Sequence, residues 1–64
     1  MTTIRRGGYI FRTWLGDHDP RHVHVYQDRR LVVRWDLQAG MPIEGAAPRR
    51  VVEIIRQLRS EGLL

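Results

Sequence analysis

The sequence predicts an α+β domain in which a three-stranded antiparallel β-meander carries one C-terminal helix packed on the sheet. Three short runs alternate apolar and polar residues, as strands do, and a later run has apolar residues at intervals of three and four, as a helix does. With 64 residues, the chain is expected to form one small domain, 1–64, with a single thin core. It has no cysteine, so disulfides cannot reinforce that core and a cysteine-based zinc site is excluded.

Three strands are expected between residues 8 and 37. The first runs from about 8 to 15 and ends at the turn residues of GDHDP. The second, HVHVYQ at 22–27, alternates strictly, and a polar stretch separates it from LVVRWDL at 31–37, which is typical of an antiparallel hairpin with a short loop. The face of this last strand that is expected in the core comprises Leu31, Val33 and Trp35.

The helix is expected after an irregular segment, QAGMPIEGAAP, which holds two glycines and two prolines. Pro48 fits the first helical position, and Gly62 fits the residue just past the end. The apolar stripe that should lie on the sheet comprises Val51, Ile54, Ile55 and Leu58.

The charge of the chain favours an anionic partner. Eleven basic residues, all arginine, oppose seven acidic ones, which gives a net charge of +4. The arginine fork matches phosphate and carboxylate and stacks on aromatic rings or bases, so it suits RNA or an acidic protein partner such as an antitoxin. A GC-rich genome would also replace lysine with arginine, and this alternative stays open.

The segment GDHDPRHVHVY, 16–26, contains all three histidines of the chain. Because side chains alternate along a strand, His22 and His24 are expected on one face, with Cα atoms about 6.6 Å apart, and the valines between and after them in the core. Tyr26 then shares the face of the two histidines. We therefore expect a polar functional surface at the start of the second strand.

Three interpretations of this histidine set remain open. In the first, His18, His22 and His24 are catalytic and cleave RNA without a metal cofactor, because imidazoles can remove the proton of a ribose 2′-hydroxyl and protonate the leaving oxygen. In the second, the three histidines and Asp17 bind zinc or a similar ion. In the third, the histidines are polar residues on the solvated face of a sheet, and Asp17 and Asp19 cap a turn.

Other residues are predicted to hold RNA or phosphate. Arg49 and Arg50 lie in the first helical turn, where a cation normally costs about 0.3–1 kcal/mol, so their position favours an anionic ligand. The alternative is that Glu44 or Glu53, the latter at i+4 from Arg49, neutralises them. Arg21 and Tyr26, beside the histidines, complete the predicted RNA-binding set.

The run H-D-P-R-H-V-H-V, 18–25, resembles the H-x-P-P-H-V-H-V signature of a family of small prokaryotic domains of unknown function, and GGYIF at 7–11 resembles the segment before it. Arg21 stands where that family has its second proline. The resemblance covers the first half of the chain and implies a component of a toxin–antitoxin gene pair. The layout is also similar to that of HicA-type mRNA-cleaving toxins, although no helix is expected here before the first strand. The first resemblance carries over His18, Pro20, His22 and His24.

These observations together predict a cytoplasmic, toxin-like domain that binds RNA or another phosphate-bearing ligand and cleaves RNA by histidine acid–base chemistry. No run reaches signal-peptide length or the roughly 20 apolar residues of a membrane span, so no membrane partner is expected. A small core and an exposed hairpin edge favour a homodimer. A metal-binding domain and a non-catalytic protein-interaction module stay open as alternatives.

Overall fold

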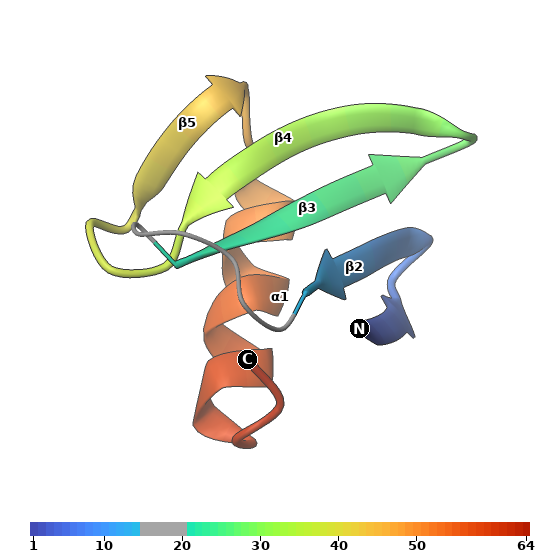
Figure 1. The fold of residues 1–64 in the computed structure, drawn as a ribbon. Helices are drawn as coiled ribbons and strands as arrows, with labels where there is room; N and C mark the ends of the chain where they lie inside the picture. The colour runs from blue at the N-terminus through green and yellow to red at the C-terminus, as the bar shows by residue number, and fades with distance from the viewer. Residues whose placement is uncertain (15–20) are drawn as a thin grey trace.

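The computed structural model describes residues 1–14 and 21–64, which form one antiparallel sheet with a helix on one of its faces (Figure 1). The strands follow one another across the sheet in the order of the sequence, β1-β2-β3-β4-β5. The predicted α+β meander with a C-terminal helix is confirmed, but its sheet has five strands where three were expected. The elements are β1 (Thr2–Arg6), β2 (Tyr9–Thr13), β3 (His22–Gln27), β4 (Arg30–Asp36), β5 (Met41–Gly45) and α1 (Arg49–Ser60).

The three predicted strands correspond to β2, β3 and β4. The second strand has the predicted bounds, and the other two begin or end within a residue or two of them. The expected hairpin between β3 and β4 is confirmed as an antiparallel pair. Its two-residue turn is made by Asp28 and Arg29, both with positive φ, a conformation whose twist matches that of the flanking strands.

The first strand, β1, was missed because its own residues carry little apolar pattern. Only Ile4 of this strand packs against the core, opposite its partner Phe11 on β2. A signal was nevertheless present, because Gly7 and Gly8 have φ of 62° and 83° and form the two-residue turn between the strands. Two adjacent glycines between short extended runs are typical of a hairpin.

The last strand, β5, was missed because it contains Pro42 and all of its residues are exposed. Proline is tolerated on an edge strand, since the missing N–H there has no ladder partner to satisfy. The strand ends at Gly45, where a Cβ would lie 2.4 Å from the backbone oxygen of Val32. Only glycine allows β5 to approach β4 this closely at a φ of 80°.

The core lies between the sheet and α1. The predicted apolar stripe of the helix is confirmed, because all four of its residues belong to this core. Among residues 1–14 and 21–64, the buried apolar residues are Phe11, Val23, Val25, Val33, Trp35, Leu37, Val51, Ile54, Ile55 and Leu58.

A bulge in the β3–β4 pair changes which residues of β4 face the core. Val25 pairs with Val33, but the next residue, Tyr26, pairs with Leu31, so Val32 is the extra residue. Val32 packs against the core, whereas Leu31 is 41% exposed. The predicted core position of Leu31 is therefore wrong, because a single inserted residue reverses the alternation of side chains beyond it.

The helix begins one residue later than predicted. Pro48 is the N-cap with an extended ψ of 153°, so Arg49 occupies the first helical position. The C-terminal prediction is confirmed, since Gly62 follows the cap residue with a φ of 78°. No helix in the described ranges 1–14 and 21–64 is long and apolar enough to cross a membrane.

Polar contacts tie the C-terminal end of α1 to the sheet. Arg6 of β1 donates two hydrogen bonds to Glu61, at 2.6 and 2.9 Å, and this contact lowers the pKa of the Glu61 carboxyl. Arg59 donates to the backbone oxygen of Leu37, just after β4. The end of β1 and the residue that follows β4 are therefore both held against the C-terminal end of the helix.

Candidate functional site

The two strand histidines point away from the core. Val23 and Val25 are fully buried under the helix, so His22 and His24, which alternate with them, lie on the opposite face of β3. Both histidines are half-buried, and their ring centroids are 5.1 Å apart. This is the arrangement that the alternation of HVHVYQ predicts.

Neighbouring strands add rings and cations to the same face, which is the face opposite α1. We call this surface the outer face, and its described rings and cations are Arg12, Trp14, His22, His24, Tyr26 and Arg34. By register it also carries Ile10 beside Tyr26 and two carboxylates, Asp36 opposite His22 and Glu44 opposite Arg34.

His24 is the centre of the outer face. Across the sheet it is paired with Arg12 of β2 on one side and with Arg34 of β4 on the other. Along the face, the edge of its ring contacts Trp14 at 4.6 Å between centroids, and its plane lies within 11° of that of Tyr26, at 6.4 Å. One imidazole is thus surrounded by two guanidinium groups and by flat rings.

The two arginines have hydrogen-bonding capacity that the described residues leave unused. The Nε atoms of Arg12 and Arg34 are buried and have no hydrogen-bond partner within the described part of the chain. The guanidinium carbon of Arg12 also lies 5.5 Å from the centre of the Tyr26 ring, a cation–π contact that fixes its position. Buried polar groups are normally hydrogen-bonded, so these two atoms are exceptions within the described ranges, and a ligand would have to meet the guanidinium groups through their terminal N–H donors.

The structure does not bring Arg49 and Arg50 together with the histidines. They begin α1, which covers the other face of the sheet. Glu53 lies 3.7 Å from Arg49 and 3.8 Å from Arg50, so the geometry agrees with the alternative in which this carboxylate neutralises both. Arg21 is exposed just before β3, and its backbone oxygen accepts a hydrogen bond from Leu37.

Two members of the predicted metal set, Asp17 and His18, lie outside the described residues, as do Asp19 and Pro20. Among residues 1–14 and 21–64, no group of three or more His, Asp or Glu side chains is placed to hold a metal ion. The carboxylate of Asp36 lies opposite His22, but it accepts the backbone N–H groups of the turn that follows β4.

The arginines beside His24 were not among the predicted phosphate-binding residues. Strand alternation alone placed Arg12 and Arg34 on the polar sides of their strands. Which arginine lies beside which histidine depends on the register in which neighbouring strands pair. The sequence of a single strand does not encode that register. From the sequence, Arg12 and Arg34 were expected only to extend a basic surface across the sheet together with Arg5 and Arg6, if the register allowed it.

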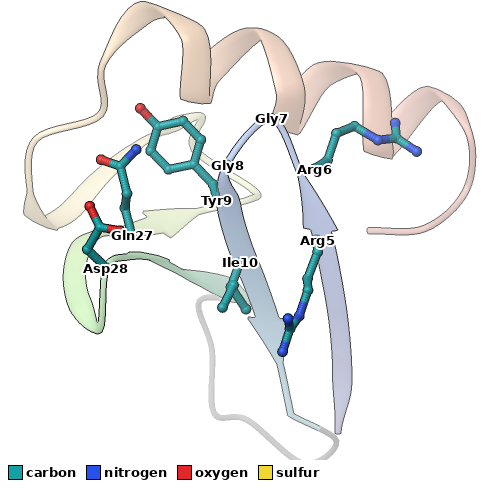
Figure 2. Close-up of a pocket in the computed structure, with 8 residues that line it drawn as sticks. All are labelled: Arg5, Arg6, Gly7, Gly8, Tyr9, Ile10, Gln27 and Asp28. Carbon is teal, nitrogen blue, oxygen red and sulfur yellow. The ribbon is translucent and has the colours of Figure 1, made fainter.

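Two cavities open near the outer face. One of about 280 Å³ is lined by Ile10, Arg12, Tyr26 and Arg29. Another of about 440 Å³ lies at the β1–β2 turn, where Figure 2 shows Arg5 and Ile10 pointing to one side of the hairpin. In the same view Arg6 points toward the helix, where Glu61 neutralises its charge.

Comparison of the chain with protein-family models, with curated proteins and with solved structures found no match. The chemistry of the outer face is therefore the observation from which a function can be inferred.

Proposed function

We propose that the outer face binds single-stranded RNA. The observation that carries this proposal is the placement of Arg12 and Arg34 on either side of His24, across three adjacent strands. Proteins bind single strands by combining cationic groups along the phosphate backbone with aromatic rings on which bases stack. The outer face supplies both, because Trp14 and Tyr26 flank the same histidine.

The overall charge supports the same partner. The chain carries +4, and all of its basic residues are arginine, whose donor fork fits phosphate oxygens. The resemblance to toxin–antitoxin components adds a second expectation. An acidic antitoxin-like protein would bind the same arginines and would compete with RNA for the outer face.

Salt dependence of binding tests this proposal. Each arginine that contacts a phosphate of a single strand contributes about 0.7 to the slope of log affinity against log salt. Arg12→Gln and Arg34→Gln should therefore weaken the binding of fluorescein-labelled RNA and lower that slope by about 0.7 each. Arg49→Gln and Arg56→Gln, on the other face, are the matched controls. Equal losses in both pairs would contradict a binding site on the outer face.

The histidine pair gives the bound strand a route to cleavage. Two imidazoles with centroids 5.1 Å apart can both reach one phosphodiester and its ribose. One imidazole removes the 2′-hydroxyl proton, the 2′-oxygen attacks phosphorus, and the bond to the 5′-oxygen breaks as the other imidazole protonates it. The products are a 2′,3′-cyclic phosphate and a 5′-hydroxyl, and Arg12 and Arg34 are placed to stabilise the charge that develops on the phosphate.

Replacing both histidines separates cleavage from binding. His22→Ala combined with His24→Ala should abolish cleavage of a labelled RNA, because the acid and the base are both removed. The arginine contacts stay in place, so affinity should fall far less than the cleavage rate. His18→Ala, at a residue outside the described ranges, should slow cleavage less than the double variant does.

The products and the substrate provide the controls for cleavage. Wild-type products should end in a 2′,3′-cyclic phosphate, and a 2′-deoxy residue at the cleaved position should block the reaction. Cleavage that survives the double histidine variant, or that proceeds on DNA, would refute the catalytic roles while leaving RNA binding to be judged by the salt experiment.

A further inference from the structure

The cavity of about 280 Å³ on the outer face, which we call the Tyr26 cavity, adjoins the histidine pair. Two of its three strand residues, Ile10 and Tyr26, are cross-strand partners on β2 and β3, and the third is Arg12 of β2. Arg29 reaches it from the β3–β4 turn. The ring of Tyr26 lies 6.4 Å from that of His24, so one lining residue separates the cavity from the candidate catalytic groups.

The walls of the Tyr26 cavity suit a flat, aromatic ligand. Ile10 supplies an apolar wall, and the Tyr26 ring supplies a stacking surface. The guanidinium of Arg12 lies over that ring, 5.5 Å from its centre, and adds a second planar group to the lining. A nucleobase meets both requirements, because each of its faces is apolar and its edge is polar.

The hydrogen-bonding groups of the Tyr26 cavity select among the bases. Arg12 and Arg29 can only donate, and the Tyr26 hydroxyl is the one side-chain acceptor among the four lining residues. Adenine and cytosine place an amino donor on the edge that would face the arginines, and the two acceptors of uracil are separated by its N3–H donor. Guanine presents O6 and N7 as an adjacent acceptor pair that matches the arginine fork, and its N1–H and amino donors lie on a different edge.

We propose that the Tyr26 cavity is the base subsite of the RNA-binding face and that it selects guanine, an inference that rests on the proposed function. A guanine bound there brings the phosphodiester of its own nucleotide to His22 and His24. RNA is then bound, and cleaved, preferentially next to guanine.

The test uses four labelled pentanucleotides that differ only at the middle base, CCGCC, CCACC, CCUCC and CCCCC. The wild-type chain should bind CCGCC about 5- to 150-fold more tightly than CCACC, which is the range for one bidentate contact to a base edge. Arg29→Lys keeps the charge but removes the fork, so it should bring the affinities for CCGCC and CCACC close to one another. Arg30→Lys, at the next residue and outside the cavity lining, should leave the preference intact.

A parallel titration with guanosine and adenosine monophosphates, followed through the NMR methyl signals of Ile10, distinguishes failure of the base subsite from failure of RNA binding. Equal affinity for all four pentanucleotides would overturn the base subsite and leave RNA binding in place. A second outcome is that no pentanucleotide binds but guanosine monophosphate shifts the Ile10 methyl signals at lower concentration than adenosine monophosphate does. This would support the base subsite and contradict RNA binding. Absence of both responses overturns both.

Discussion

The turn between β1 and β2 should be far less tolerant of alanine at its first glycine than at its second. An added Cβ at Gly7 would lie 2.7 Å from Cδ1 of Ile54, whereas one at Gly8 would meet no atom within 4 Å. Both residues have positive φ, so each alanine costs about 1–2 kcal/mol from backbone strain. At Gly7 the crowding of a fully buried side chain adds about 1–3 kcal/mol.

Urea unfolding followed by circular dichroism measures this difference. The expected loss is about 2–5 kcal/mol for Gly7→Ala and about 1–2 kcal/mol for Gly8→Ala. Ile54→Val removes Cδ1 and costs about 0.5–1.5 kcal/mol alone, but in the Gly7→Ala background it should cost less or even stabilise, because it relieves the contact. Equal losses at the two glycines, or full additivity with Ile54→Val, would refute the packing of this turn on α1.

Three further predictions concern the ion pair, the bulge and metal binding. The Arg6 contact lowers the pKa of Glu61, so the ion pair stabilises the fold at pH values above the usual pKa range of glutamate. This contribution is lost as the pH falls through the folded-state pKa of Glu61. The free energies of unfolding of the wild type and of Glu61→Gln should therefore differ at pH 7 and converge in acid. Leu31→Ser should change the unfolding free energy by no more than about 0.5 kcal/mol because the residue is exposed, while Val33→Ala should cost about 2 kcal/mol, and the reverse order would place the bulge elsewhere. Elemental analysis should find no stoichiometric zinc, and a melting temperature that falls with chelator would instead support the metal interpretation.

Local pattern was enough to predict the helix and three strands of the fold. The stripe that includes Ile54 and Leu58 and the alternation of HVHVYQ are properties of a single segment, and the structure confirms both. The two missed strands lie at the edges of the sheet, where few side chains are buried, so hydrophobic alternation is absent. The bulge at Val32 was not predictable because it arises from pairing with β3, which a single segment does not encode.

The candidate site, like the fold, was predictable only where the relevant pattern lies within a single strand or helix. His22 and His24 share a face because they are two residues apart on one strand, which sequence alone predicts. Their arginine neighbours come from other strands, and only the register pairs Arg12 and Arg34 with His24. Arg49 was chosen for its position in a helix, and the packing of that helix on the other face separates it from the histidines.

The two tryptophans of the chain lie on opposite faces of the sheet and provide the most direct test of RNA binding on the outer face. Trp14 contacts His24 on that face, whereas Trp35 is 9% exposed and belongs to the core. Titration of isotope-labelled protein with single-stranded RNA, followed through the two indole N–H signals and assigned with Trp14→Phe, should shift the Trp14 signal and leave that of Trp35 in place. An unmoved Trp14 signal at RNA saturation, with shifts at Arg49 and Arg50 instead, would contradict the account.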